Sequence, residues 1–321
     1  MGRMEKPSGS HGSVERPVRL DRLGLARALT RIERGQSRDD EFAIAIDHPA
    51  HVVGITGPPG VGKSTLVAAL TTQLREAGGV VVVLAVDPSS PITGGALLGD
   101  RIRMSAQAAD DGVFIRSLAN RGQLGGLSAA VPAAIRAAIG YGADTVLVET
   151  VGVGQSDVDI ASHADTTIVV TSPAAGDSVQ AGKAGLLEVA DILVVNKSDL
   201  EGATQAVRDL REAQRPRAQG ADIWRVPVVP TRADAGEGVA ELVARLWEHV
   251  DQLRTSGALR TARADRARDE LRAIAMNRLS ATLQERLSAD VGGVVADVRS
   301  GRRSPASAAD AVLTDMLRTT T

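Results

Sequence analysis

The sequence predicts an α/β fold in which a mostly parallel sheet is flanked by helices, with helical extensions at both ends of the chain. Three observations support this prediction. Apolar runs rich in β-branched residues alternate with helical segments, which is typical of parallel strands covered on both faces. A glycine-rich loop separates the first run from the helix that follows it. After about residue 252 the alternation ends and an arginine-rich segment with helical periodicity begins.

These patterns divide the 321 residues into three expected parts. Residues 1–50 would form a flexible tail and an N-terminal helical extension, residues 51–251 the α/β domain, and residues 252–321 a C-terminal helical arm. The strands of the domain are predicted at 51–56, 79–86, 145–148, 166–171, 192–196 and 226–230.

Both extensions have the pattern of amphipathic helices. One helix is predicted over 18–34, a long one over 265–287, and a short one over 304–317. The apolar stripe on one face of the long helix fits two interpretations equally well: packing on the α/β domain, or a subunit interface. Its members are Leu271, Ile274, Leu279, Leu283 and Leu287.

The composition argues against several classes of protein. The formal net charge of −2 gives no basic signature, so no nucleic-acid partner is expected. The absence of cysteine excludes disulfides and thiolate metal sites and fits a reducing compartment, so we expect a cytoplasmic protein. The longest apolar runs have the length of strands, so no membrane segment is expected either.

The strongest local motif is GPPGVGKST, which matches G-x-x-x-x-G-K-[ST] between a predicted strand and a predicted helix. The motif predicts a P-loop NTPase, because backbone N–H groups and the helix N-terminus of such a loop surround phosphate oxygens. Lys63 is expected to reach the β- and γ-phosphates, and the Ser64 hydroxyl to ligate Mg²⁺. The expected phosphate-binding residues are Gly57, Pro58, Pro59, Gly60, Val61, Gly62, Lys63, Ser64 and Thr65.

The stretch NKSD, which follows the apolar run ILVV, predicts that the base is guanine. The Asp199 carboxylate can accept from N1–H and from the 2-amino group of guanine, a pair of donors that adenine lacks. Asn196 precedes it at the strand end, and the stem of Lys197 can lie against the base.

A third contact with the base is expected from the stretch TRADAGEG, residues 231–238. A backbone N–H of Ala233 or Asp234 would meet the base oxygen there. Many guanine-binding domains have Ser-Ala at this point, whereas this chain has Arg232-Ala233. A backbone contact survives that change, but a contribution from a serine side chain does not.

Acidic residues at strand ends are the candidates for holding Mg²⁺ beside a P-loop nucleotide. Asp87 and Glu149 each end an apolar run, and Asp100 lies on a loop that could close over the γ-phosphate. The predicted metal ligands are therefore Ser64, Asp87, Asp100 and Glu149. Together with Lys63, the carboxylates of Asp87 and Glu149 are also candidate catalytic groups.

The stretch VETVGVGQ resembles a switch that senses the γ-phosphate. Gly152 lies three residues after Glu149, which is the spacing of D-x-x-G with Glu in place of Asp. Gln155 is a candidate for orienting the attacking water, but in Ras-like proteins that glutamine follows the glycine directly. Gln155 could equally be an amide that stabilises the loop.

With these motifs, the sequence resembles the methylmalonyl-CoA mutase-associated GTPases, the MeaB family of the SIMIBI class. The resemblance rests on GITGPPGVGKST, VLAVDPSSPITGGALLGDRIRM, VLVETVGVGQSDVDI and GDSVQAGKAGLLEVADILVVNKSD. It implies a GTPase that is a chaperone of an adenosylcobalamin-dependent acyl-CoA mutase. Such a chaperone gates loading of the mutase's cofactor and protects or reactivates the mutase. Mg²⁺ would accompany the bound GTP or GDP, and this chain itself would hold no cobalamin.

The resemblance also assigns roles that the residue patterns leave open. It implies a homodimer made by the C-terminal arm, which favours the interface interpretation of the stripe. It further implies that residues 172–185 couple the nucleotide state to the partner, with Lys183 reaching toward the nucleotide. Lys183 is one of only four lysines, against 33 arginines.

Two other functions are weighed against this one. A SIMIBI metallochaperone would share the nucleotide motifs, but the five histidines form no i,i+4 pair and have no cysteine partners. An ATP-driven kinase or transport component is disfavoured by NKSD, which selects against adenine.

Overall fold

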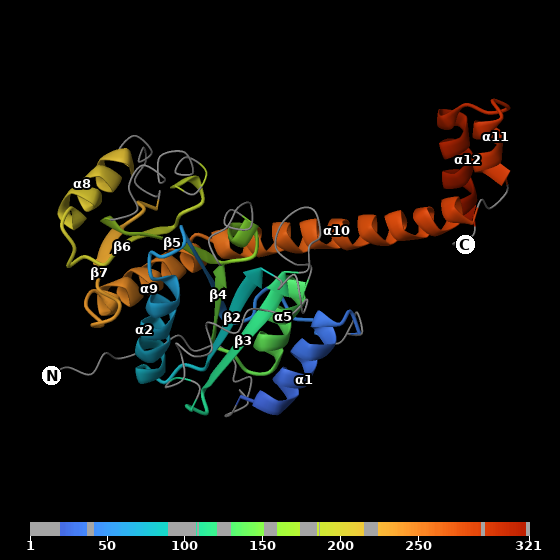
Figure 1. Ribbon diagram of the computed structural model, residues 1–321. Helices are drawn as coiled ribbons and strands as arrows, with labels where there is room; N and C mark the ends of the chain where they lie inside the picture. The colour runs from blue at the N-terminus through green and yellow to red at the C-terminus, as the bar shows by residue number, and fades with distance from the viewer. Residues whose placement is uncertain are drawn as a thin grey trace. The chain divides into compact units, whose positions relative to one another are not determined.

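A computed structural model shows the arrangement of the chain (Figure 1). It divides the chain into two compact units, Met1–Ala262 and Arg263–Thr321. The residues that the structure describes are 20–36, 42–88, 107, 109–120, 130–150, 159–173, 185, 187–214, 224–289 and 293–318.

The first unit is built on a seven-stranded sheet with the order β3-β2-β4-β1-β5-β6-β7. All of its neighbouring strands pair in parallel, as the continuous apolar runs predict. The strands are β1 (His51–Thr56), β2 (Val81–Pro88), β3 (Val113–Asn120), β4 (Thr145–Thr150), β5 (Thr166–Thr171), β6 (Ile192–Asn196) and β7 (Val228–Thr231).

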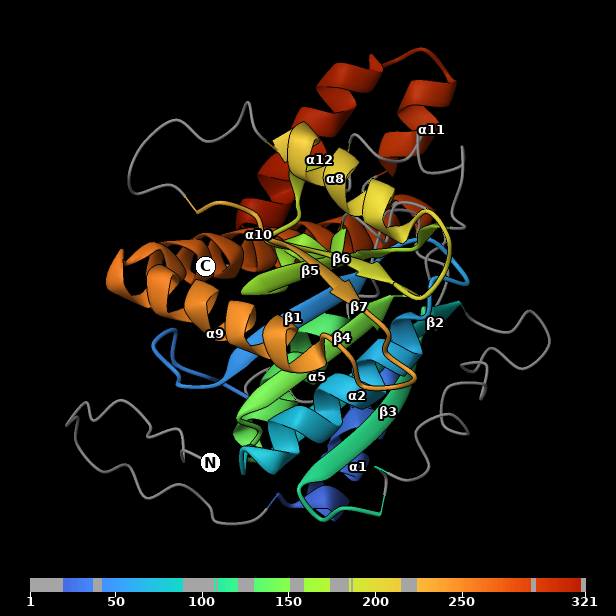
Figure 2. The same ribbon diagram turned by 90° about the vertical axis from the view of Figure 1, so that its left-hand side faces the viewer.

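Helices cover both faces of this sheet, which confirms the predicted fold class. Viewed from the side of α9, α2 and α9 lie in front of the sheet and α1 and α5 behind it (Figure 2). The helices of this unit are α1 (Arg22–Glu33), α2 (Lys63–Glu76), α5 (Ala130–Gly140), α8 (Ala203–Gln214) and α9 (Val239–Thr255), with a short 3₁₀ turn η1 (Ile160–Ser162).

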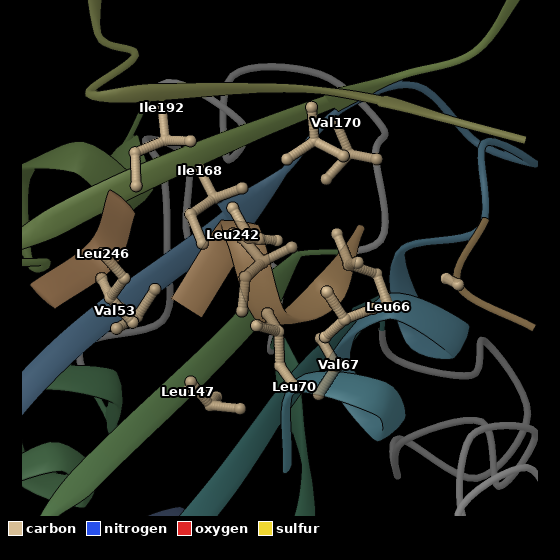
Figure 3. Close-up of a cluster of buried hydrophobic side chains, with 14 of the residues drawn as sticks. Val53, Leu66, Val67, Leu70, Leu147, Ile168, Val170, Ile192, Leu242 and Leu246 are labelled. Carbon is tan, nitrogen blue, oxygen red and sulfur yellow. The ribbon is translucent and has the colours of Figure 1, made fainter. Parts of the chain in front are cut away.

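The alternation of side chains along each strand divides the core between the two faces. Val53 and Ile55 of β1 pack with Leu66 and Leu70 of α2, whereas their neighbour Val52 packs on the opposite face. Figure 3 shows the first of these clusters, in which side chains of β1, β4, β5 and β6 meet those of α2 and α9. The central strands are therefore buried on both sides, and the polar site residues of the sheet lie at strand ends.

Strand β3 was not among the predicted strands and is the main correction to the expected sheet. Its sequence, VFIRSLAN, carries Arg116 and Ser117 in the middle of the apolar run, which hides the pattern of a buried strand. The interruption is tolerated because β3 is an edge strand and Arg116 forms an ion pair with Glu33 of α1. The turn before β3 is held by Arg75, which donates to both carboxylate oxygens of Asp110 at 3.0 and 2.8 Å.

The second unit consists of helices, as expected for the C-terminal arm. It contains most of α10 (Ala258–Ser288), then α11 (Val294–Arg299), which was not predicted, and α12 (Pro305–Arg318). An ion pair between Arg286 and Asp315 joins α10 to α12. In the part of the chain that the structure describes, no helix is both long enough and apolar enough to cross a membrane.

Candidate functional site

The candidate site lies at the carboxyl ends of β1, β2 and β4, which are adjacent in the sheet. The P-loop starts directly after Thr56, the last residue of β1. Ile55 of β1 and Ala85 of β2 are both paired in register with Glu149 of β4. The sheet therefore brings Glu149 beside the P-loop, although the two are far apart in the sequence. The carboxyl ends of parallel strands are where α/β proteins usually bind ligands.

Two glycines of the P-loop are required by their surroundings. Gly57 has φ +143°, and a Cβ at this position would lie 2.0 Å from the carbonyl oxygen of Val170. Gly62 has φ +94° as the residue before α2, and a Cβ there would lie 2.5 Å from Nδ2 of Asn196. Only glycine fits these two positions without moving β5 or the NKSD loop.

Lys63 is the first residue of α2 and is buried, with 6% of its surface exposed. Its Nζ donates to the carbonyl oxygens of Gly57 at 2.7 Å and of Pro58 at 3.0 Å. The ammonium group thus lies inside the curve of the loop. A cation held there is suited to meeting an anion that enters the same loop.

Ser64 and Glu149 are brought together in the same place. The Ser64 hydroxyl donates to Oε1 of Glu149 at 2.7 Å, and both residues are buried. A hydroxyl and a carboxylate are the hard oxygen ligands that Mg²⁺ prefers, so this pair fits a magnesium ion. The backbone of Asp87 lies near the end of β2, beside β4, but its side chain is outside the described part of the structure.

A second buried pair joins the same two strand ends. The hydroxyl of Thr150 donates to that of Thr56 at 3.0 Å, and both threonines are fully buried. Thr56 precedes the P-loop and Thr150 follows Glu149. The P-loop and the segment after Glu149, which would contact the phosphates, are therefore joined by a hydrogen bond at the strand ends from which they start.

The NKSD loop is attached directly to the P-loop. Asn196 donates through Nδ2 to the carbonyl oxygen of Val61 at 2.9 Å, and Lys197 donates through Nζ to that of Gly60 at 2.8 Å. Lys197 has φ +58°, a left-handed conformation that is uncommon for a residue with a side chain. That conformation marks Lys197 as a constrained position in the loop.

The NKSD loop is also attached, through the same Asn196 side chain, to the end of β7 and the segment that follows it. Oδ1 of Asn196 accepts from the Thr231 hydroxyl and from the Ala233 amide, both at 3.1 Å. Thr231 was not among the predicted site residues. The signal for it was its place as the last strand residue before Arg232-Ala233.

Arg232 lies among three carboxylates in this segment. Its Nε is 3.4 Å from Oδ1 of Asp234 and 4.0 Å from Oδ1 of Asp199, and its Nη1 is 3.9 Å from Oε1 of Glu237. The predicted base-binding residues Asp199, Arg232, Ala233 and Asp234 thus lie close together. Four other predicted residues lie outside the described part of the chain: Asp100, Gly152, Gln155 and Lys183.

Comparison with known proteins shows the family. The family model of "Methylmalonyl Co-A mutase-associated GTPase MeaB" matches residues 25–288. The chain belongs to this MeaB family, and it is therefore a GTPase. This confirms the family and the activity that the motifs predicted.

Relatives and a solved structure agree with the assignment over most of the chain. A Pyrococcus abyssi protein named as a GTPase is 43% identical to this chain. The match covers 95% of this chain and 96% of the length of that protein. The mouse "Methylmalonic aciduria type A homolog, mitochondrial" is 36% identical over 77% of this chain and 64% of its own. The crystal structure of an LAO/AO transport system kinase shares the fold, with TM-score 0.63, 24% identity and coverage of 94% and 95%.

Proposed function

We propose that this MeaB-family GTPase binds GTP and GDP with Mg²⁺ through the residues described above and serves as a chaperone of an adenosylcobalamin-dependent acyl-CoA mutase. The observation that carries the nucleotide proposal is the attachment of the NKSD loop to the P-loop through Asn196 and Lys197. This attachment fixes the distance between a phosphate-binding loop and a base-binding loop. The two loops together are then suited to holding the phosphates and the base of a single nucleotide.

Guanine would be read by side-chain and backbone groups at the ends of β6 and β7. Asp199 accepts from N1–H and the 2-amino group of the base, while Asn196 holds the two loops around it. The Ala233 amide already donates to Asn196. Of the two predicted donors to the base oxygen, the Asp234 amide is the one with no hydrogen bond within the described residues, so we assign the contact to it.

The phosphates would be held by the P-loop amides and by Lys63. When they enter, the ammonium group of Lys63 leaves the carbonyl oxygens of Gly57 and Pro58 and contacts phosphate oxygens instead. Ser64 and Glu149 would hold Mg²⁺, with Asp87 and Asp100 as further acidic candidates. A bound magnesium ion neutralises charge that develops on the phosphate oxygens during hydrolysis.

The switch and coupling segments complete the proposal. Gly152 would sense the γ-phosphate through its amide, and Gln155 would either orient water or stabilise the loop. Lys183 would reach the nucleotide from the segment that responds to the partner. These three roles rest on the sequence motifs and on membership of the family.

The mutase partner is proposed from the names of the family and of one relative. The family is described as associated with methylmalonyl-CoA mutase, and the mouse relative is named for methylmalonic aciduria. A GTPase that changes conformation on hydrolysis is suited to admitting a cofactor to a partner at one stage only. The predicted cytoplasmic location stays a prediction.

A homodimer is proposed from the apolar stripe of α10. Leu271 and Leu279 are 69% and 53% exposed in the single chain, and Ile274 and Leu287 are exposed as well. A contiguous apolar stripe on a long helix marks an interaction surface. Sedimentation of the wild type and of a Leu271→Asp/Leu279→Asp variant tests this: the variant should be monomeric, and two monomeric proteins would contradict the proposal.

The chaperone role is tested by adding an adenosylcobalamin-dependent acyl-CoA mutase to the purified protein. We expect the rate of GTP hydrolysis to change, and transfer of adenosylcobalamin to the apo-mutase to depend on GTP. A Lys63→Met variant serves as the control that cannot use the nucleotide. If transfer proceeds equally with GTP, with GDP and with the variant, the gating role is wrong.

A further inference from the structure

Arg232 occupies the position where many guanine-binding domains have a serine, and its surroundings suggest a role for it. Its backbone is fixed, because its amide donates to the Glu237 carbonyl at 3.0 Å and its carbonyl accepts from the Glu237 amide at 3.1 Å. The two residues form an isolated antiparallel bridge. The root of the Arg232 side chain is therefore held by a tight loop.

The guanidinium group of Arg232 also lies near two carboxylates. Asp234 lies 3.4 Å from Nε, and Glu237 lies 3.9 Å from Nη1. Nε is buried even though the residue is partly exposed. Nε makes no hydrogen bond within the described residues, so these contacts are ion pairs that attract the guanidinium group toward both carboxylates.

That position is beside the carboxylate proposed to read guanine. Nε of Arg232 is 4.0 Å from Oδ1 of Asp199. This distance allows attraction between the charges but exceeds that of a hydrogen bond. Such an attraction would favour one orientation of Asp199 without occupying the lone pairs that the base would need.

A backbone hydrogen bond also joins the NKSD loop to the end of β7 and keeps Asp199 and Arg232 next to each other. The Ser198 amide donates to the Thr231 carbonyl at 3.0 Å, so the residues next to Asp199 and Arg232 are hydrogen-bonded to each other. Asp199 itself is 46% exposed, so its side chain would otherwise be free to adopt other rotamers.

We propose that Arg232 is a positioning residue for base recognition, which holds the Asp199 carboxylate in the orientation that accepts from both N1–H and the 2-amino group of guanine. The inference rests on the proposed contact between Asp199 and the base. Arg232 would thus replace the serine side chain that many guanine-binding domains have at this position. It also explains why the loop can lack serine and still read guanine.

The test is equilibrium binding of GDP and IDP to the wild type, Arg232→Met and Arg232→Lys. Hypoxanthine keeps N1–H but lacks the 2-amino group, so the GDP to IDP affinity ratio reports the second donor. Because exposed ion pairs are weak, we expect Arg232→Met to lower the ratio by roughly two- to fivefold. Arg232→Lys, which keeps the charge, should recover part of it.

A matched control is Arg245→Met in α9. Arg245 also pairs with two carboxylates, Glu241 and Glu248, but far along the chain from the NKSD loop. We expect the control to leave the ratio unchanged. Thermal unfolding of both methionine variants checks that each is folded.

An Asp199→Ala variant separates failure of the inference from failure of the proposed base contact. If Asp199→Ala keeps the wild-type ratio, Asp199 does not read the 2-amino group, and both ideas are overturned. If Asp199→Ala abolishes the preference while Arg232→Met leaves the ratio unchanged, or weakens GDP and IDP equally, only the positioning role is wrong. A lowered ratio in Arg232→Met, and no further effect of that change in an Asp199→Ala background, supports it.

Discussion

The two ends of the sheet both hold buried polar side chains, but they use them in different ways. At the carboxyl ends, Lys63, Ser64 and Glu149 lie in or beside a glycine loop and include opposite charges. At the amino ends, two strand residues, His51 and Thr166, meet His249 of α9 in the interior. The first group faces loops that could receive a ligand, and the second joins regular elements to one another.

The amino-end group is a continuous chain of hydrogen bonds. The Thr166 hydroxyl lies 2.8 Å from Nε2 of His51 and 2.8 Å from Nδ1 of His249. A hydroxyl has one proton, so if it donates to one ring, the nitrogen of the other ring must donate to it. The tautomers of the two histidines are therefore coupled, and this end of the molecule requires particular protonation states.

Burial of polar groups alone therefore does not mark a functional site. The amino-end residues have partners within the folded elements, whereas the carboxyl-end residues join glycine loops whose amides can bind anions. In parallel sheets this asymmetry is general, because ligands bind at the carboxyl ends. Substitutions at the two ends should therefore have separable effects, on activity at one end and on stability at the other.

The largest effect is expected at the carboxyl end, from Lys63→Met. Removing the cation from the P-loop should lower kcat/KM for GTP about 10²- to 10³-fold, as loss of a preorganised electrostatic group typically does. Phosphate release measures the rate. Lys63→Arg should also be impaired, because a planar guanidinium does not fit a site shaped for an ammonium group. Near-normal turnover in either variant would contradict the role given to Lys63.

A smaller loss is expected from Glu149→Gln, which keeps the size and an acceptor for Ser64 but removes the charge. Loss of a charged contact costs about 1.5–3 kcal/mol, so turnover should fall roughly 10- to 100-fold. Half-maximal activity should also require more Mg²⁺. Titration of Mg²⁺ into the GDP complex, followed by calorimetry, gives a readout other than activity. An unchanged Mg²⁺ requirement would remove Glu149 from the metal site.

At the amino end, a comparable effect is expected on stability rather than on turnover. Burial lowers the pKa of His249 to about 4, against 6.5 in an exposed residue, while the Asp165 charge opposes the shift. The pKa of His249 is lower in the folded state than in the unfolded state. The stabilisation from burying the neutral ring is therefore complete above pH 6.5 and is lost as the pH falls toward 4. The contribution of His249 to the free energy of unfolding should be about 2 kcal/mol smaller at pH 5 than at pH 7.

Urea unfolding of the wild type and of His249→Gln at the two pH values checks this. Other groups titrate in the same range, so the relevant quantity is the difference between the two proteins. An equal pH dependence in wild type and His249→Gln would show that His249 is not the group responsible.

The smallest effect is expected from Thr150→Val, which keeps the shape of the side chain and removes its donation to Thr56. Loss of one buried hydrogen bond should lower the free energy of unfolding by about 1 kcal/mol. Because this pair lies at the carboxyl end, the apparent affinity for GDP should fall too, unlike in His249→Gln. Equal GDP binding by Thr150→Val and the wild type would mean that the strand ends need no such tie.

Much of the sheet could be predicted because its central strands are continuous apolar runs. Strand β3 could not, since Arg116 and Ser117 interrupt the run and the ion pair of Arg116 with Glu33 is a long-range contact. The P-loop and NKSD residues were found from short local motifs. The position of Glu149 beside Ser64 agrees with the expectation that a carboxylate at a strand end lies beside the P-loop.

The contacts between distant residues had no local signal. His51, Thr166 and His249 belong to no motif, and their separations in sequence are 115 and 83 residues. The same holds for Arg232, which could be recognised as a departure from Ser-Ala but not as a neighbour of Asp199. Only the three-dimensional arrangement shows which side chains complete each end of the sheet.

The base preference of an Asp199→Asn variant shows whether the carboxyl end reads a guanine nucleotide through Asp199. Xanthine has a carbonyl where guanine has the 2-amino group, so an asparagine amide can donate to it while no longer accepting from guanine in the same way. The competition of GDP and XDP for the purified protein should reverse, with the wild type preferring GDP and Asp199→Asn preferring XDP. A variant that still prefers GDP as strongly as the wild type would contradict the account.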